Sequence, residues 1–164
     1  MRTTFRAAPA CVLAFLAAAL PAAAQAPGYQ QLDNRQIFAE FHAEVLTSVN
    51  DLMARWGDAW AEDRIDDLMD LYWENAVLVP PQGGPPARGQ RAIRTWLEEN
   101  LGDMGGMEAF MLDFDASGGM ATVFGNYLLQ QDGNAATLST GPVVTVYLLR
   151  GRTWKIRSQM FTPN

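Results

Sequence analysis

The sequence is almost without cysteine, since its one residue of this type, Cys11, lies in an apolar run near the N-terminus. The rest of the chain therefore cannot form a disulfide, bind a metal through thiolates or use a cysteine nucleophile. Histidine is equally scarce, and a lone residue such as His42 is far more often a packed or solvated side chain than a ligand or a base. We expect no metal site and no bound cofactor.

Basic residues are also in short supply, because 12 Lys and Arg face 18 Asp and Glu, which gives a formal net charge of −6. Nucleic-acid binding relies on a positively charged surface, so we expect no nucleic-acid partner. The N-terminal apolar run, residues 7–20, is too short to span a bilayer. We therefore expect no membrane partner for the mature chain.

This apolar run has the features of a secretory signal peptide. Arg2 and Arg6 precede it, and the small residues of "PAAAQAP" follow it. Cleavage after Ala24 satisfies the small-x-small rule, whereas cleavage after Ala26 would leave a proline at the new N-terminus. A retained membrane anchor is the alternative, and the small residues argue against it. Removal of residues 1–24 takes the net charge from −6 to −8, and we expect a periplasmic or secreted protein.

The first half of the mature chain has helical patterns. Residues 25–34 form a polar N-terminal arm, after which apolar residues recur at spacings of three and four over residues 36–60. This spacing predicts one long helix, or two with a break near Asn50. A short helix is expected over residues 63–72 with Asp63 as its N-cap, and a third helix over residues 90–101.

The second half has strand patterns. The segment "AVLVPP" predicts a strand over residues 76–79 that stops at Pro80 and Pro81, because proline cannot donate a ladder hydrogen bond. After the third helix, apolar and polar residues alternate in four segments, which predicts an antiparallel meander over residues 107–117, 120–131, 136–150 and 153–161. Helices followed by strands indicate a single α+β domain over residues 35–164.

The order of these elements resembles the SnoaL-like and ketosteroid isomerase-like proteins of the nuclear transport factor 2-like superfamily. The segments that carry the resemblance are "LMARWGDAWAEDRIDDLMDLYWENAVLVPPQGGPPARGQRAI" and "WKIRSQMF". The resemblance implies a cone-shaped fold in which three N-terminal helices pack on a curved, mostly antiparallel sheet around an apolar pocket. It also implies a homodimer, since such cones often pair through the open face of the sheet.

The residues of the isomerase mechanism do not carry over. Its general base falls on Pro80, its tyrosine donor falls on Trp56, and its protonated aspartate falls on Thr145. Tyr72 matches a supporting tyrosine, but the third tyrosine of that network falls on Leu97. Proton abstraction needs a base within reach of the carbon acid, so we expect no steroid isomerisation.

The resemblance also suggests which side chains line the pocket. On the last strand, Arg157, Gln159 and Phe161 would face inward, where a guanidinium and an amide suit an anionic or a carbonyl ligand. The alternative is a register that turns Arg157 to solvent, and core filling is the alternative for the tryptophans. The full set of expected lining residues is Trp56, Trp60, Tyr72, Tyr127, Thr145, Tyr147, Arg157, Gln159 and Phe161.

The carboxylates give no clear catalytic site, and the catalytic residues stay unknown. Asp113 and Asp115 share a face of one expected strand, where a solvated edge is the simpler interpretation. Four more aspartates surround the second helix and suit a wet helical face, namely Asp63, Asp66, Asp67 and Asp70.

Three functions remain open from the sequence. The first is a domain that binds a small apolar or anionic molecule in its pocket. The second is a SnoaL-like enzyme, a cyclase, dehydratase or hydrolase, with an unplaced carboxylate. The third is a dimeric interaction module whose pocket is filled by its own side chains. An empty cavity of several hundred Å³ favours the first over the third.

Overall fold

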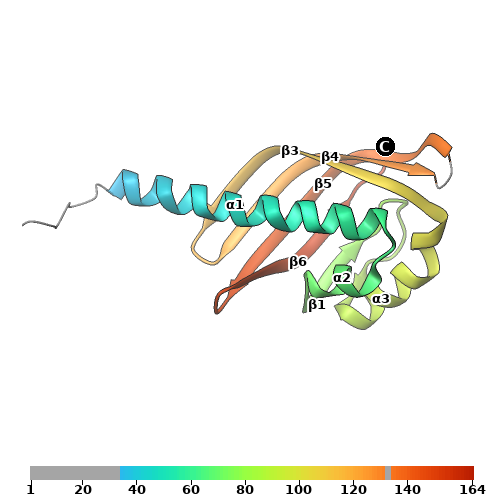
Figure 1. Ribbon diagram of the computed structural model, residues 1–164, viewed down its shortest axis with the longest axis horizontal. Coiled ribbons are helices and arrows are strands. Elements are labelled where there is room, and N and C mark those ends of the chain that lie inside the picture. Colours follow the sequence, from blue (N-terminus) through green and yellow to red (C-terminus); the bar gives the residue numbers. More distant parts are fainter. Residues whose placement is uncertain (1–33, 132–133) are drawn as a thin grey trace, which may run out of the picture. The chain divides into compact units, whose positions relative to one another are not determined.

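The computed structural model describes residues 34–131 and 134–164. The expected signal peptide and all but the last residue of the expected arm lie outside the described residues. In the unit Leu32–Asn164, three helices lie against one face of a curved six-stranded sheet (Figure 1). The helical elements are α1 (Asn34–Ala61), α2 (Ile65–Asp70), α3 (Gly89–Asn100) and the 3-10 helix η1 (Leu101–Asp103). The strands are β1 (Tyr72–Val79), β2 (Ala87–Arg88), β3 (Met104–Ser117), β4 (Met120–Gln131), β5 (Asn134–Arg150) and β6 (Thr153–Phe161).

Helix α1 is one unbroken helix with no interruption at Asn50. Its large buried side chains recur every three or four residues, so a single stripe faces the sheet; they are Val45, Val49, Leu52, Trp56 and Trp60, and Ala59 is buried beside them. The helix ends where Asp63 adopts φ of 52°, a conformation that aspartate tolerates better than most residues. The expectation that Asp63 is the N-cap of α2 was wrong, because Arg64 holds that position and makes no side-chain cap.

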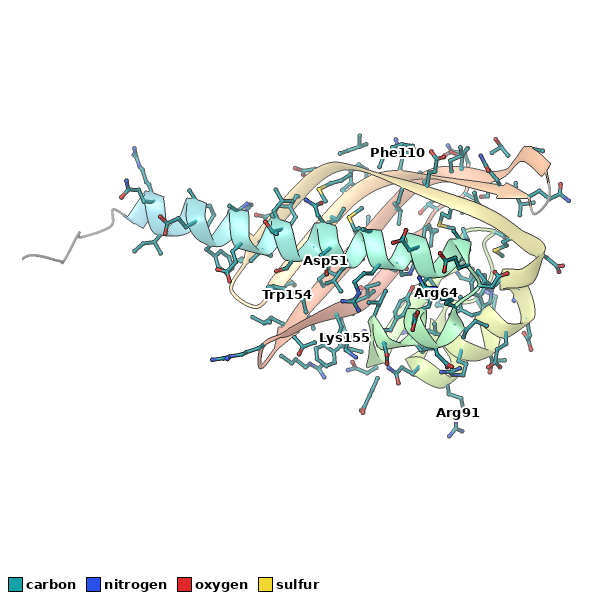
Figure 2. All side chains as sticks on the ribbon, in the orientation of Figure 1. Asp51, Arg64, Arg91, Phe110, Trp154 and Lys155 are labelled. Carbon is teal, nitrogen blue, oxygen red and sulfur yellow. The ribbon has the colours of Figure 1, made fainter. Side chains whose placement is uncertain are left out.

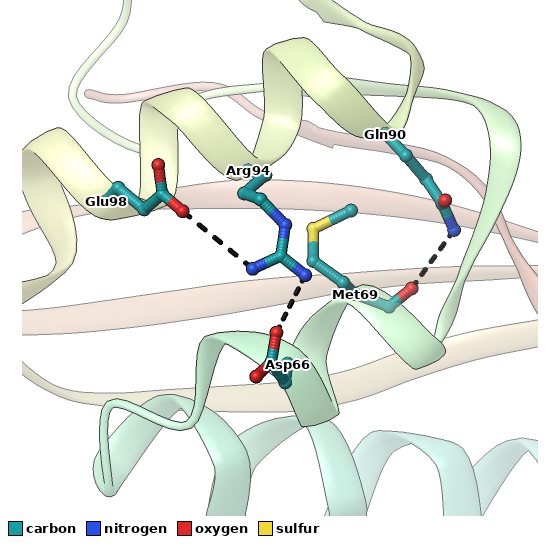
Figure 3. Close-up of polar contacts among 5 residues, drawn as sticks. All are labelled: Asp66, Met69, Gln90, Arg94 and Glu98. Carbon is teal, nitrogen blue, oxygen red and sulfur yellow. Dashed lines mark hydrogen bonds and ion pairs between the residues drawn. The ribbon is translucent and has the colours of Figure 1, made fainter.

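Helix α3 is fixed to α2 by side chains on its first two turns (Figure 3). The Arg94 guanidinium lies 2.8 Å from the Asp66 carboxylate and 3.8 Å from that of Glu98. Gln90 donates from Nε2 to the carbonyl oxygens of Met69 and Tyr72, at 3.3 and 2.9 Å. These contacts hold α3 where α2 passes into β1.

The sheet has the strand order β2-β1-β6-β5-β4-β3. Strands β3 to β6 form the expected antiparallel meander, and β1 joins it in parallel beside β6. Strand β1 begins at Tyr72, so the expectation that this residue ends a helix was wrong. The main-chain N–H of Ile156 donates to the Leu71 carbonyl at 2.7 Å, which draws the chain into the sheet directly after α2.

Two glycines accommodate a close approach of neighbouring main chain. A Cβ on Gly125 in β4 would lie 2.2 Å from the carbonyl oxygen of Phe110 on the paired strand β3, whose register shifts by one residue between Met111 and Asp113. A Cβ on Gly141 in β5 would lie 2.0 Å from the carbonyl oxygen of Thr162 in the C-terminal tail. Only glycine fits such close approaches of one backbone to another.

The core fills the space between α1, α3 and the helix-facing side of the sheet. Alternate residues of β4 point into it, as the period of two requires, whereas register shifts interrupt this alternation in β3 and β6. Among its fully buried side chains are Trp60, Tyr72, Leu78, Leu97, Tyr127, Leu129, Ile156 and Phe161. Within residues 34–131 and 134–164, no helix combines the length and apolar character needed to cross a bilayer.

Candidate functional site

A small cavity lies between α1 and the helix-facing side of the sheet. Its volume is about 30 Å³, and the residues around it are Met53, Trp56, Ala109, Phe110, Val123, Gly125, Val143, Thr145, Tyr147 and Gln159. One water molecule needs roughly 10–15 Å³ of such space, whereas ligand pockets measure roughly 300–1,000 Å³. In this conformation the cavity has room for water or for the tip of a ligand.

Three polar side chains behind the cavity form a hydrogen-bonded chain. Trp56 donates from Nε1 to the Tyr72 hydroxyl oxygen at 3.0 Å, and Tyr72 donates onward to Oε1 of Gln159 at 2.5 Å. An indole can only donate, so the Tyr72 oxygen must accept from it and its proton must go to Gln159. The Gln159 carbonyl is thereby engaged, and its NH2 group is left for the cavity.

Three hydrogen-bonding groups at the cavity have no protein partner among the described residues. They are the hydroxyls of Thr145 and Tyr147 and the amide nitrogen of Gln159. The exposed fractions of these side chains are only 5%, 2% and 6%. No side-chain polar atom of the described residues is both shielded from solvent and without a hydrogen-bond partner, so these three groups reach the cavity space and are available there to water or to a ligand.

The two buried tyrosines are held in their neutral form. Burial raises the pKa of Tyr72, because a phenolate would lose its hydration there, and the Trp56 hydrogen bond offsets only part of this effect. Burial likewise raises the pKa of Tyr147, with a smaller contribution from Tyr72. Both groups therefore act as neutral hydroxyls and not as bases.

Among the described residues that line the cavity there is no carboxylate and no histidine. The proline corner at the end of β1 is a structural anchor. Tyr127 and Ser139 donate from their hydroxyls to the carbonyl oxygen of Pro81 at 2.7 and 2.6 Å. These bonds tie the corner to β4 and β5.

The cavity adjoins a surface groove between α1 and β3. The groove has a volume of about 400 Å³ and is lined by Met53, Ala54, Trp56, Gly57, Asp58, Met107 and Ala109. Three of these residues, Met53, Trp56 and Ala109, also border the cavity. The groove and the cavity therefore share a border, which these three residues form.

The family model of the SnoaL-like domain matches residues 53–156. The chain belongs to this family. Solved structures with the same fold include a protein of unknown function from Mycobacterium tuberculosis, at 15% identity and a TM-score of 0.66, with 74% of this chain and 77% of that one covered. A putative dehydratase of the nuclear transport factor 2-like family from Streptomyces avermitilis matches at 15% identity and a TM-score of 0.65, with 74% and 97% covered.

A nuclear transport factor 2-like protein with a cystatin-like fold from Novosphingobium aromaticivorans matches at 16% identity and a TM-score of 0.63, with 79% and 89% covered. The search of curated proteins found no significant match. Identities this low establish the fold alone, and the expected α+β architecture is confirmed. They carry no activity from these proteins to this SnoaL-like domain.

Four of the nine expected lining residues border the cavity, namely Trp56, Thr145, Tyr147 and Gln159. The others pack around it: Tyr72 lies behind Gln159, Trp60 donates to the Gly105 carbonyl at 3.2 Å, and Tyr127 and Phe161 contact each other with ring centroids 4.9 Å apart.

Arg157 is not among the residues that line the cavity. Tyr147 pairs with Ile156, whereas Val146 pairs with Ser158, so a bulge interrupts the pairing of β5 with β6 and leaves Arg157 unpaired. The strict alternation that was expected along this strand is broken there. Ile156 is buried and Arg157 is only half-buried.

The sequence did offer signals for some lining residues that were not expected. Met53 lies one helical turn before Trp56, so the two share a face of α1. Gly125 interrupts an alternating strand, which is typical of a close backbone approach. Nothing in the sequence indicates the register shift of β3 between Met111 and Asp113, next to Gly125.

The candidate carboxylates lie away from the cavity. Asp113 and Asp115 are exposed on β3, and Asp115 lies 3.6 Å from Nε2 of His42, which also accepts a hydrogen bond from the Ala116 N–H. On and before α2, Arg64 pairs with Asp67 and with Glu62. Within the part of the chain that the structure describes, no three histidine, aspartate or glutamate residues gather in a way that could hold a metal ion.

Proposed function

We propose that this SnoaL-like domain is a small-molecule-binding protein, periplasmic or secreted, that takes the hydrogen-bond-accepting end of a neutral ligand into the cavity. The observation that supports the proposal is the set of three polar groups that face the cavity without a protein partner, on Thr145, Tyr147 and Gln159. An acceptor atom of a ligand satisfies the Gln159 NH2 group and both hydroxyls.

The chemistry around the cavity favours a neutral ligand over an anion. No cationic side chain lines the cavity, and an unpaired carboxylate in such a place costs several kcal/mol of desolvation. A ketone, aldehyde, ester or alcohol presents an acceptor without a charge. Arg157, which suggested an anionic ligand, does not reach this site.

The groove between α1 and β3 supplies the space for the rest of the ligand. Its small residues Ala54, Gly57 and Ala109 leave room over the helix and strand. Met53 stands between the groove and the cavity, and an unbranched thioether changes rotamer at low cost. The ligand is therefore slender and apolar, with an oxygen at one end that enters past Met53.

The proposal excludes acid–base catalysis at this site. Both tyrosines that could exchange a proton have a raised pKa, and no carboxylate or imidazole faces the cavity. Bound ligand is released unchanged.

Isothermal titration calorimetry with a series of 2-alkanones, from 2-butanone to 2-nonanone, tests this proposal. We expect affinity to rise with chain length, because each buried methylene contributes about 0.8 kcal/mol. The matched n-alkanes should bind roughly ten-fold or more weakly, because they leave the buried donors unsatisfied. Tyr147→Phe should weaken the binding of the ketones about ten-fold with little loss of folding stability, since its hydroxyl has no protein partner.

Tyr127→Phe is the matched control. Its hydroxyl donates to the Pro81 carbonyl and does not line the cavity, so we expect about 1 kcal/mol of lost stability with unchanged ketone affinity. Absence of heat with every ketone, or equal binding of ketones and alkanes, would contradict the proposed ligand class.

A dimeric interaction module is the second candidate, favoured by the cavity volume of about 30 Å³ and by the other face of the sheet. Across four strands, the register places four apolar residues in one row, namely Val79, Met160, Val144 and Phe124. Phe124 and Met160 are 44% and 39% exposed. A second copy of the chain that pairs through this face would cover the row.

A further inference from the structure

Positive charge is concentrated at one end of an acidic chain. The segment 150–157, "RGRTWKIR", has four basic residues and no acidic one, while the whole sequence has a net charge of −6. It forms the turn between β5 and β6 and most of β6. We call the side chains of Arg150, Arg152, Lys155 and Arg157 the basic hairpin.

The cations of the basic hairpin are not neutralised within the protein. Among the described residues, the arginines paired with carboxylates are Arg55, Arg64 and Arg94, all on or beside the helices. The cross-strand neighbours of Arg150 and Lys155 are the uncharged residues Thr153 and Leu148. An acidic protein that leaves these cations unpaired presents a local positive surface that its total charge does not reveal.

An indole gathers two of these cations. The Arg150 guanidinium carbon lies 4.9 Å and the Lys155 ammonium 5.6 Å from the ring centroid of Trp73. Trp73 is itself fixed, because its Nε1 donates to the Leu148 carbonyl at 3.0 Å. Cation–π attraction thus holds two positive charges beside one aromatic ring, and it neutralises neither of them. Figure 2 shows Trp154 and Lys155 together near the β5–β6 turn.

We propose that the basic hairpin binds the surface of an anionic phospholipid bilayer. Clustered Lys and Arg bind anionic headgroups, and tryptophan is the residue enriched at membrane interfaces. The expected export of the protein leaves bilayer surfaces within its reach. The sequence-based expectation of no membrane partner rested on the length of apolar runs, which does not detect peripheral attachment.

The hairpin suits a lipid surface better than a specific polyanion. Arg150 and Lys155 lie over the ring of Trp73, whereas Arg157 lies at the bulge in β6. Recognition of a single phosphate uses two parallel hydrogen bonds from one arginine in a fixed orientation, and these cations are not arranged in that way. Lipid headgroups move within the plane of the bilayer, so they can arrange themselves around these cations. Attachment by four charges is reversible and sensitive to salt.

Vesicle co-sedimentation of the exported protein, with intact mass used to verify that residues 1–24 are absent, tests the proposal. We expect binding to phosphatidylglycerol vesicles at low salt and none to phosphatidylcholine vesicles. Each cation near an anionic surface contributes roughly five-fold in affinity, so Arg150→Gln/Arg152→Gln should weaken binding by about 25-fold.

Arg88→Gln/Arg91→Gln is the matched control, because it removes the same charge from two exposed arginines outside the hairpin, and Arg91 extends from α3 into solvent (Figure 2). We expect this variant to bind phosphatidylglycerol vesicles as the unaltered protein does. Equal losses in the two variants would show that only total charge matters and would overturn the proposal. So would absence of binding to these vesicles, or hairpin-dependent binding to duplex DNA or polyglutamate in place of vesicles.

Discussion

A single indole sets the direction of hydrogen bonding at the candidate site. Trp56 can only donate, so Tyr72 must accept from it and donate to Gln159, and the Gln159 NH2 group is left at the cavity. The isomerase-like proteins that the chain resembles use a tyrosine at the position of Trp56. A tyrosine there could donate or accept, whereas the indole of Trp56 fixes the direction of every hydrogen bond in the chain.

The buried tyrosines predict a loss of stability in alkaline solution. The pKa of Tyr72 and of Tyr147 is raised in the folded state, so the unfolded chain releases these protons first, near pH 10. Their contribution is complete below that pH and is lost as the pH rises toward the higher folded values. Each tyrosine lowers the free energy of unfolding by up to about 1.4 kcal/mol per pH unit in that window.

Urea denaturation followed by circular dichroism between pH 8 and 11.5 measures this loss. Tyr147→Phe removes one of the two groups without breaking a protein hydrogen bond, so its stability should fall less steeply above pH 10. Parallel curves for the variant and the unaltered protein would contradict the assignment.

The residues that border the cavity could be predicted only in part from the sequence. Trp56, Thr145, Tyr147 and Gln159 were expected from the resemblance alone, and all four border the cavity. Arg157 was expected beside them. A bulge of one residue in β6 removed it, because one extra residue in a strand shifts which side chains face inward.

At the scale of the elements, the site depends on how β3 pairs with β4. The register shifts by one residue between Met111 and Asp113, and the Phe110 carbonyl comes so near Gly125 that a Cβ there would lie 2.2 Å from its oxygen. Ala109 and Phe110 border the cavity from this stretch of β3.

Gly125→Ala should therefore destabilise the protein by about 3 kcal/mol or more, because neither backbone can give way without moving a strand. Urea denaturation is the measurement. Gly106→Ala is the control in β3, since the nearest atom to its Cβ is a side-chain oxygen at 3.9 Å, and its change should stay within about 0.5 kcal/mol. A small effect at both positions would show that the main chain of β3 does not approach Gly125 so closely.

Element types could be predicted better than their ends. The helical periodicity of α1 and the alternation of β3 to β6 are long and regular, and both are present. The sequence predicts the start of β1 at residue 76, four residues after its start at Tyr72 in the structure. An apolar residue such as Tyr72 fits the helical and the strand period equally well. The hydrogen bond from the Ile156 N–H to the Leu71 carbonyl ends the helix before Tyr72, and the sequence around Tyr72 gives no sign of this distant partner.

At the scale of the whole molecule, the row across the outer face of the sheet predicts self-association. Phe124→Glu places a charge at one end of this row, on its most exposed member, and we expect it to convert a dimer into monomers in analytical ultracentrifugation. Ile37→Glu is the control, because Ile37 is 50% exposed on α1, outside the sheet. A monomeric unaltered protein, or equal dissociation by both substitutions, would contradict pairing through the sheet.

The aromatic packing beside the cavity also has an optical consequence. The ring centroids of Trp56 and Trp60 are 5.0 Å apart, and those of Trp60 and Trp96 are 6.4 Å apart. Indoles at such separations share their excited states, so light absorbed by any of the three is emitted in common. Since Trp56 borders the cavity, the emission of this trio and its exciton couplet report directly on whatever enters beside Gln159.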